Sequence, residues 1–323
     1  MRAFGGLPAS VAFLAALIAH QPAHAENWPQ RPVRIVVPFP AGGNTDTIAR
    51  IVAQPLTESF GQPFVIENRA GAAGAIAAEA VARAPADGYT LLMATVAQIA
   101  IVPAMSKVPY DPATDFVPIS NVGTNPFVLA VHPGIPARDI KEFVAYVRER
   151  PNQISYSAVP GAPSYLTMVL FLKRAGLEMV PVSYKGGPAQ MSDLLAGHVP
   201  VNFTLMSDAV PHATSGKLRL LAVSSAQRVP QLPDVPTLSE SGFPGFRTLT
   251  WNGLFAPAGT PKEIIDRVAA EVSRAVKGKE LRERFAAIGV DPLGNTPAEF
   301  ATMIAADTAL WGEAVQAAGV QQK

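Results

Sequence analysis

Two adjacent glycines, Gly42 and Gly43, lie in a loop that joins a β-rich run to a helical pattern. Glycine has no Cβ and reaches positive φ at little cost, so backbone N–H groups in such a loop can face a ligand. The first amides and the dipole of the following helix favour a negative group, and Asp46 or Thr45 can cap that helix. A ligand with a negative group is therefore expected here, although a tight strand-to-helix turn explains the glycines equally well.

Two further glycine-containing junctions connect β-rich runs to helical patterns, at residues 158–165 and 183–188. In the first, Ser164 can cap the helix. The second offers the hydroxyl of Tyr184 and the ammonium of Lys185, for which a solvated position at a loop tip is the commoner situation. Helix N-termini from separate parts of the chain could converge on one anion.

Side chains that perform catalysis or hold metals show no recognisable spacing. Beyond residue 25 the histidines are His132, His198 and His212, none of them in an H-E-x-x-H pattern, and the chain has no cysteine. No G-x-S-x-G sequence exposes a serine, and neither a Walker loop nor a complete dinucleotide fingerprint is present. We therefore expect a binding protein with no catalytic residue, no metal and no cofactor.

The first 25 residues have the pattern of a secretory signal peptide. Arg2 is their one charged residue, residues 11–19 are apolar, and Ala23-His24-Ala25 forms a small-x-small cleavage pattern before Glu26. This stretch is too short for a bilayer core of roughly 30 Å, and no later segment has the roughly 20 uninterrupted apolar residues that spanning needs. We expect a soluble mature chain that is secreted through a cleavable signal peptide.

The mature chain carries almost no net charge. Arg2 is one of the 26 lysines and arginines, so 25 remain to face 25 aspartates and glutamates. A neutral chain has no field that attracts nucleic acid or an anionic membrane surface, and any bound anion must be held by local donors. We expect no nucleic-acid partner, no disulfide or lipid-modified cysteine, and a monomer.

β-rich runs alternate with helical patterns along the mature chain, which is typical of an α/β protein with mostly parallel sheets flanked by helices. Helix starts are clear where Asp139 and Thr296 begin capping-box patterns and where Thr260 precedes a proline. Strands are expected at residues 33–37, 64–67, 90–94, 127–131, 154–158, 179–183, 201–204 and 218–224.

The length of the mature chain fits two lobes. We expect a discontinuous lobe formed by residues 26–125 and 249–323, with residues 126–248 inserted as a second lobe. The chain would pass between the lobes at Asn125-Pro126 and within residues 241–251, which are rich in glycine and aromatic residues. A ligand cleft between the lobes follows from this arrangement.

Many short sequences in this chain, taken in order, resemble the Bug family, also called the tripartite tricarboxylate transporter receptors. The resemblance extends over essentially the whole mature chain and is specific for that reason, although each motif alone is weak. It is carried by Trp28-Pro29, residues 34–43 (RIVVPFPAGG), Asp46, Glu67-Asn68-Arg69, residues 87–92 (DGYTLL), Tyr110-Asp111-Pro112, Tyr184-Lys185-Gly186, residues 193–197 (DLLAG), 216–219 (GKLR), 232–237 (LPDVPT) and 256–261 (APAGTP).

The resemblance implies a two-lobed, type II periplasmic binding-protein fold whose cleft closes on a small carboxylate and delivers it to the membrane permease subunits of a tripartite tricarboxylate transporter. It also implies that loops of both lobes hold the ligand through backbone amides and ordered water. In the first lobe the implied ligand-binding residues are Phe39, Ala41, Gly42, Gly43, Asn44, Asp46, Thr95 and Gln98. In the second lobe they are Ala158, Gly161, Ala162, Ser164, Tyr165, Tyr184, Gly186, Thr204 and Asp208.

Three positions depart from the family pattern. Ala162 stands in a loop that often contains serine, Tyr165 stands where histidine is common, and Thr204 occupies a frequently acidic position. Fewer polar groups and an added ring favour a less polar ligand, such as an aromatic carboxylate, over a citrate-like one, although Tyr165 could equally pack against its own lobe. Presentation of the bound solute to a membrane sensor kinase is the alternative function, and an exported α/β hydrolase is a more distant one.

Overall fold

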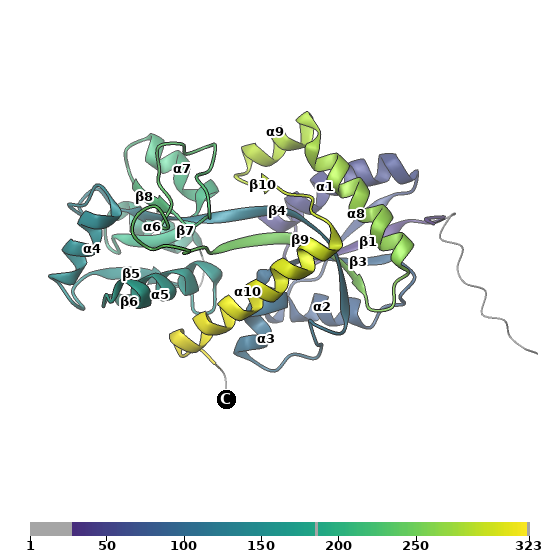
Figure 1. The fold of residues 1–323 in the computed structure, drawn as a ribbon, viewed down its shortest axis with the longest axis horizontal. Helices are drawn as coiled ribbons and strands as arrows, with labels where there is room; N and C mark the ends of the chain where they lie inside the picture. Colours follow the sequence, from purple (N-terminus) through teal and green to yellow (C-terminus); the bar gives the residue numbers. More distant parts are fainter. Residues whose placement is uncertain (1–27, 185–186, 322–323) are drawn as a thin grey trace, which may run out of the picture.

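The computed structural model describes residues 28–184 and 187–321, which form two α/β lobes side by side (Figure 1). The predicted signal peptide lies outside the described residues. Lobe 1 contains α1 (Asn44–Phe60), α2 (Ala75–Ala82), α3 (Val102–Met105), α8 (Lys262–Lys277) and α9 (Lys279–Ala287). Lobe 2 contains α4 (Ile140–Arg148), α5 (Pro163–Ala175), α6 (Gly187–Ala196) and α7 (Met206–Thr214).

Lobe 1 is built on a sheet of mixed direction. β1 (Val33–Val37) lies between β2 (Phe64–Asn68) and β3 (Thr90–Thr95) and is parallel to both. β9 (Leu249–Pro257) is antiparallel to β3 and to β4 (Phe116–Val131). The prediction of mostly parallel sheets is right for β1, β2 and β3 but wrong for β4 and β9, because β9 re-enters lobe 1 against the direction of β3.

Helices cover both faces of this sheet because successive strand residues point to opposite sides. Ile35 of β1 belongs to the core beneath α1 and α8, where Ile48 and Val268 are fully buried. Val36, the next residue, belongs to the core beneath α2 and α10 (Pro297–Ala318), where Phe300 is fully buried. The carboxyl end of β1 leads into the loop before α1, whereas β3 passes through Val96 directly into a short π-helix (Ala97–Ile101).

Lobe 2 uses the last residues of β4 as its central strand. β7 (Val201–Leu205) and β8 (Arg219–Val223) pair antiparallel with it, one on each side. β5 (Ser155–Ala158) and β6 (Val180–Ser183) form a separate parallel pair. Every predicted strand is present within one residue of its expected bounds, except that β4 begins at Phe116; β9 and the short β10 (Asp291–Pro292) were not predicted.

Two strands carry the chain between the lobes. β4 pairs with β9 up to Pro126, which lies opposite Leu249, and from Phe127 onward β4 pairs with β7 and β8 instead. β4 therefore changes its partner strands at the same level of the molecule at which β9 begins. We call this level the waist.

Ser224 ties the two passages together at the waist. Its side chain is fully buried, its Oγ accepts a hydrogen bond from the N–H of Phe127 at 2.9 Å, and it donates one to the carbonyl of Thr248 at 2.5 Å. Its backbone N–H and carbonyl pair with the same two residues, at 2.8 and 2.9 Å. One serine thus satisfies polar groups of both passages in a place that water does not reach.

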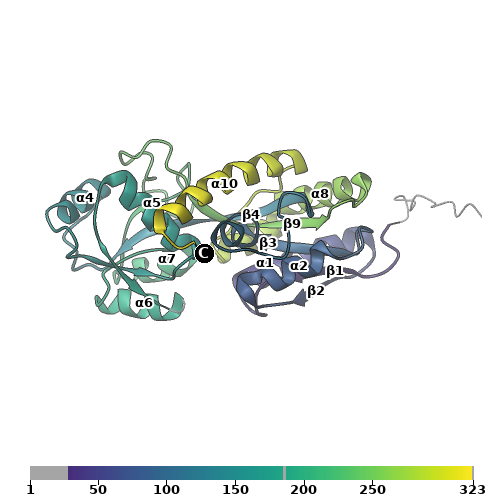
Figure 2. The ribbon, with the colours of Figure 1, turned by 90° about the horizontal axis from the view of Figure 1, so that it is seen from below.

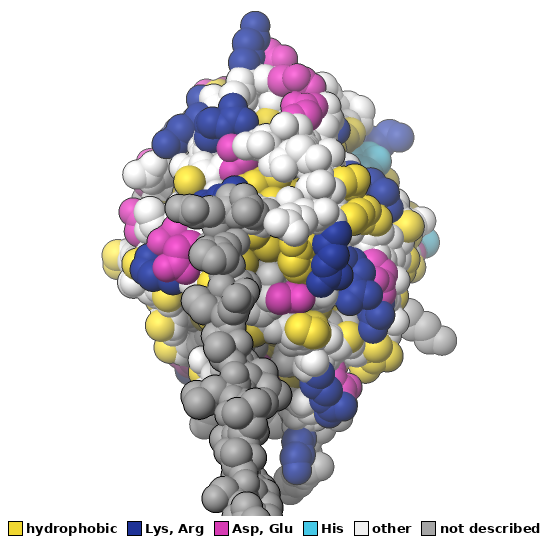
Figure 3. Space-filling view, turned by 90° about the vertical axis from the view of Figure 1, so that its right-hand side faces the viewer, with side chains coloured by type: hydrophobic (Ala, Val, Ile, Leu, Met, Phe, Trp, Pro, Cys, Tyr) yellow, Lys and Arg dark blue, Asp and Glu magenta, His cyan; other side chains and the backbone are white. Residues whose placement is uncertain are grey.

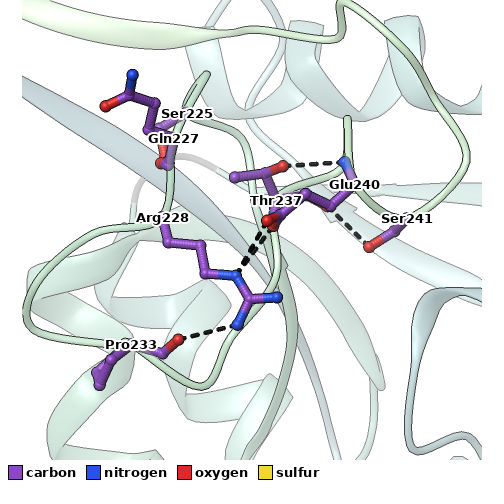
Figure 4. A network of polar contacts seen from close by, with 7 residues as sticks. All are labelled: Ser225, Gln227, Arg228, Pro233, Thr237, Glu240 and Ser241. Atoms are coloured by element: carbon purple, nitrogen blue, oxygen red, sulfur yellow. Dashed lines mark hydrogen bonds and ion pairs between the residues drawn. The ribbon is translucent and has the colours of Figure 1, made fainter.

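A polar network holds the segment between β8 and β9 (Figure 4). The guanidinium of Arg228 donates to both carboxylate oxygens of Glu240 and to the carbonyl of Pro233. Glu240 accepts from the N–H of Thr237 at 2.7 Å and its own N–H donates to the Thr237 hydroxyl at 3.0 Å. This segment is consequently anchored before the chain returns to the waist as β9.

Helix α10 lies across both lobes (Figure 2). Asp307, which is 2 % exposed, accepts hydrogen bonds from Trp251 Nε1 of β9 at 2.8 Å and from Arg247 at 3.3 Å. Burial raises the pKa of Asp307, while Arg247 and Trp251 oppose this rise. Nearer its end, α10 reaches lobe 2 through an ion pair between Glu313 and Lys173 of α5.

Two predicted helix starts are confirmed. The Asp139 side chain accepts from the N–H of Glu142 at the start of α4, and Thr296 forms a full capping box at the start of α10. The predicted cap at Thr260 is wrong: α8 begins after Pro261, and the Thr260 hydroxyl donates instead to the carbonyl of Pro257.

Asp46 fixes the loop that precedes α1, although it is not the N-cap that was predicted. The N-cap is Gly43, and the 3 %-exposed carboxylate of Asp46 reaches back to accept from the N–H of Gly42, from Arg50 and from Asn68 at 2.8–2.9 Å. Burial alone would raise the pKa of Asp46, but these hydrogen bonds and the charge of Arg50 lower it from 3.8 to about 2.

Replacement of Ser224 by alanine is expected to lower the free energy of unfolding by about 1–3 kcal/mol, because it leaves the buried N–H of Phe127 with one partner fewer and removes the bond to Thr248. Ser225→Ala is the matched control, since the neighbouring hydroxyl is exposed and bonds only locally. Urea denaturation of both variants tests this, and equal midpoints would contradict it.

Asp46→Asn is expected to lower the free energy of unfolding at pH 7 by roughly 2 kcal/mol, since one unit of pKa shift corresponds to about 1.4 kcal/mol. The folded-state pKa lies below the ordinary value, so the ionised carboxylate stabilises the fold above about pH 4, and this contribution is lost as the pH falls from about 4 to about 2. Urea denaturation between pH 7 and pH 3 should show the difference shrinking. A constant difference would refute this account, and exposed Asp234→Asn serves as the control.

Candidate ligand-binding site

A cavity of about 970 Å³ lies between the two lobes and is lined by both. Lobe 1 contributes the loop before α1, the end of β3 and part of β9. Lobe 2 contributes the first turns of α5, α6 and α7 and the end of β7. The loop after β1 and the carboxyl end of β3 form one wall, and the carboxyl ends of strands are the place where open α/β sheets bind ligands.

The first turn of α1 presents backbone donors to this cavity. Gly43, the N-cap, has an extended backbone with φ −73° and ψ 167°, and no side chain caps the helix. Gly43, Asn44 and Thr45 line the cavity, and no residue in the described ranges accepts a hydrogen bond from the N–H of Asn44 or Thr45. Free amides at a helix N-terminus, aided by the helix dipole, are suited to a carboxylate.

Three helices of lobe 2 also begin at the cavity. Its lining includes Ala162, the N-cap of α5, Gly187, the first residue of α6, and Leu205, the N-cap of α7. Neither α5 nor α7 has a side chain that caps its first turn. Helix N-termini of both lobes therefore face one space, where the potentials of their dipoles add.

Asp208 and His212 are the titratable side chains among the described residues that line the cavity, and none of those residues is lysine or arginine. Desolvation raises the pKa of Asp208, against the opposing effects of the Ser207 hydroxyl and of His212. Basic and acidic side chains are mixed on the end of lobe 1 that Figure 3 shows, so this end adds no field of one sign. A carboxylate in the cavity would depend on backbone amides and neutral side chains.

Apolar side chains form much of the remaining wall. Phe39, Phe127, Phe203 and Met191 all line the cavity, with Phe39 extending from the core of lobe 1 and Phe203 from that of lobe 2. Walls of this kind suit a carbon chain or a ring, with the polar groups fixing its orientation.

The cavity brings together residues that sequence reasoning placed on separate loops. From lobe 1, Phe39, Gly43, Asn44 and Thr95 line it. From lobe 2, Ala162, Ser164, Thr204 and Asp208 line it. These residues line one cavity although they are spread from residue 39 to residue 208 in the sequence.

The other predicted residues of lobe 1 do not line this cavity. Ala41, Gly42 and Asp46 lie on the outer side of the loop, where Gly42 turns the chain with φ +82°. Gln98 is fully buried behind the wall: its Oε1 accepts from the N–H and the hydroxyl of Thr95, both at 3.0 Å. Gln98 thus positions Thr95 instead of facing the cavity.

Tyr165 points away from the cavity. Its neighbour Ser164 lines the cavity, and successive residues of a helix are turned by about 100°. The ring of Tyr165 instead stacks on Tyr156, with centroids 6.4 Å apart, in a depression between α5 and α10. In this structure its ring packs within its own lobe, the alternative left open by the sequence.

Three more predicted residues of lobe 2 are engaged elsewhere. Ala158 is buried in β5, and the hydroxyl of Tyr184 bonds to Asp193 at 2.5 Å. Gly161 lies against Met105 of lobe 1, so close that a Cβ would come within 2.5 Å of the methionine methyl. Gly186 lies outside the described residues.

Sequence reasoning missed Asn252 on β9. Asn252 lines the cavity, is 2 % exposed, and its Oδ1 has no hydrogen-bond partner in the described part of the chain. Its Nδ2 lies 3.4 Å from Asn125 Oδ1. No sequence signal pointed to this residue, because β9 itself was not predicted.

Among the described residues, no group of three or more histidine, aspartate or glutamate side chains is placed to hold a metal ion. In the same part of the chain, no helix is both long and apolar enough to cross a membrane.

The sequence of this chain matches known proteins over nearly its whole length. The family model described as "Tripartite tricarboxylate transporter family receptor" matches residues 48–320. Protein BugT of Bordetella pertussis is 36% identical over 314 residues, which cover 96% of each chain. A protein encoded in the tcbD-tcbE intergenic region of Pseudomonas sp. strain P51 is 38% identical over 286 residues, which cover 88% of this chain and 85% of that protein.

Solved structures show the same fold. A protein of R. palustris with adipate has a TM-score of 0.77 and 36% identity, covering 90% of this chain and 98% of its own. MatC from Rhodopseudomonas palustris with bound malate has a TM-score of 0.73 and 33% identity, covering 89% of this chain and all 100% of its own. The predicted two-lobed α/β binding-protein fold is thereby confirmed. This chain belongs to the tripartite tricarboxylate transporter receptors, the Bug family of periplasmic solute-binding proteins, which are not enzymes.

Proposed function

We propose that this chain captures a small carboxylate between its lobes and delivers it to the membrane permease of a tripartite tricarboxylate transporter. The observation that carries the proposal is that α1, α5 and α7 begin at one cavity whose described lining contains no lysine or arginine. Backbone amides can replace the water around a carboxylate, whereas its burial without such donors would be costly.

Closure of the two lobes is the proposed means of capture. We place the lobe boundaries at residues 125/126 and 248/249, so that lobe 1 comprises residues 26–125 and 249–323. The change of strand partners at Pro126 and the link through Ser224 support this division. A ligand that contacts both walls favours the closed form by the difference between its affinities for the closed and open forms.

The ligand is proposed to combine a carboxylate with an apolar body, and an aromatic ring fits this description. Phe39 and Phe127 on the wall support an apolar body, as do Ala162 and Thr204 in place of more polar residues. Tyr165 gives no such support because it lies outside the cavity. The relatives solved with adipate and malate support a carboxylate as the anchoring group.

Export is part of the proposal. The family is periplasmic, and residues 1–25 have the sequence pattern of a cleavable signal peptide. A permease is the proposed partner of the closed, loaded form. Ligand-dependent binding to a membrane sensor kinase, with no effect of gene deletion on uptake, would favour the sensor function instead.

Gly43→Asp is expected to weaken carboxylate binding at least tenfold, because it places a negative side chain among the proposed donors at the start of α1. The backbone of Gly43 has φ −73°, which other residues adopt without strain. Gly43→Asn adds a side chain of the same size without charge and should lose much less affinity. Isothermal titration with a carboxylate identified by thermal-shift screening tests both, and unchanged affinity in Gly43→Asp would remove this loop from the site.

The mature chain recovered from the periplasm of a Gram-negative host is expected to begin at Glu26, after cleavage behind Ala23-His24-Ala25. Intact-mass measurement of the periplasmic protein checks this. Replacing Ala25 by a bulky residue such as phenylalanine should block cleavage and leave the precursor with the membrane fraction. Recovery of the uncleaved chain from the cytoplasm alone would contradict export.

A further inference from the structure

Asp208 is the one carboxylate among the described residues of the cavity lining. It stands in the first turn of α7, where an acidic side chain often caps the helix, but α7 has no side-chain cap. Within the described residues, its only hydrogen bond is a long one from the hydroxyl of Ser207, at 3.4 Å. Helix capping therefore does not account for Asp208.

The surroundings of Asp208 leave its charge poorly compensated. The side chain is open to the cavity, yet protein surrounds it closely enough to penalise the ionised form. His212, one helical turn further along α7, is the basic side chain whose charge acts on it, and Asp208 forms no ion pair within the described ranges. A carboxylate with so little compensation is stabilised most by a ligand group that donates a hydrogen bond to it from the cavity.

Asn252 supplies an independent observation of the same kind. Its amide oxygen is buried at the cavity wall without a donor, whereas its amide nitrogen lies near Asn125. The cavity thus combines free donors at the start of α1 with two acceptors: Asp208 on lobe 2, whose only hydrogen bond among the described residues is the long one from Ser207, and the amide oxygen of Asn252 on lobe 1, which has no donor there. A ligand that only accepts hydrogen bonds leaves both acceptors unmatched.

We propose that Asp208 is a specificity-determining residue that selects carboxylates bearing a cationic or hydrogen-bond-donating group, an ammonium above all, at the end remote from the carboxylate. This inference rests on the proposed function and narrows it. The carboxylate binds at the N-terminus of α1, the skeleton lies along the apolar wall, and the donor end meets Asp208 from the opposite lobe. Ligand binding then joins the lobes through complementary charge at both ends.

A dicarboxylate of the same length is disfavoured by this arrangement. Its second carboxylate would face Asp208 at neutral pH, and two carboxylates in a partly desolvated cavity repel each other. Asp208 thus gives this chain a preference different from that of the relatives solved with adipate and malate, whose ligands carry a carboxylate at each end.

The test is isothermal titration at pH 7.5 with acids matched in length: 6-aminohexanoate against adipate, and 4-(aminomethyl)benzoate against terephthalate. We expect the wild type to bind the amino acid of at least one pair tenfold or more tightly than its diacid. Asp208→Asn should reduce the ratio of the amino-acid affinity to the diacid affinity at least tenfold, partly by strengthening diacid binding. Asp234→Asn, an exposed change of the same charge, should leave the ratio unchanged. Melting temperatures establish that each variant is folded.

Three results would overturn the inference. The first is that the wild type binds the diacids more tightly than the amino acids. The second is that Asp208→Asn leaves the ratio of the two affinities unaltered. In both cases, carboxylate binding that Gly43→Asp weakens would still uphold the proposed function. Failure of the wild type to bind any of the four acids, or any carboxylate in a thermal-shift screen, rejects the proposed function and this inference together.

Discussion

The pairing of β4 with β9 at the waist is the constraint on which the rest of the structure depends. Each lobe needs part of β4: lobe 1 uses its first residues beside β9, and lobe 2 uses residues 127–131 between β7 and β8. The lobes therefore share a strand, and Ser224 bonds to both passages at the waist. The cavity lies between the lobes because the loop after β1 and the carboxyl end of β3 face the helix starts of lobe 2.

The electrostatics of the cavity follow from its backbone more than from its side chains. Four helices begin there, and the chain's charges are balanced elsewhere, so anion binding does not require a basic residue. Because these donors are neutral, a single acidic residue is enough to change the net charge of the cavity lining. In this chain that residue is Asp208, whose carboxylate can act on the ligand without disturbing a salt bridge, because it forms none among the described residues.

Sequence patterns were sufficient to predict the strand–loop–helix units. They were insufficient to predict features that depend on contacts between distant parts of the chain. β1 and β3 were predictable as apolar runs between turn signals, but β9 contains Asn252 and Gly253 and the start of β4 contains Pro118 and Gly123, which interrupt such patterns. Phe300 packs where a side chain at Gly253 would stand, so this glycine serves helix packing and not a turn.

The loops of the candidate site were predictable as well, but whether Ser164 or Tyr165 faces the cavity depends on the exact start of α5. Asn252 could not be found at all without the strand that carries it.

The position of β9 also has a consequence for how the chain acquires its structure. β3 and the first part of β4 lie on either side of β9, so the central sheet of lobe 1 stays incomplete until residues 249–257 are available. All of lobe 2 precedes these residues in the sequence, whereas its own strands pair only with one another and with the end of β4. Lobe 2 can thus assemble first, and lobe 1 must wait for contacts between residues more than a hundred positions apart, which are slow to form. A chain that emerges from export amino end first would therefore release the loop before α1 early but complete the sheet that supports this loop last.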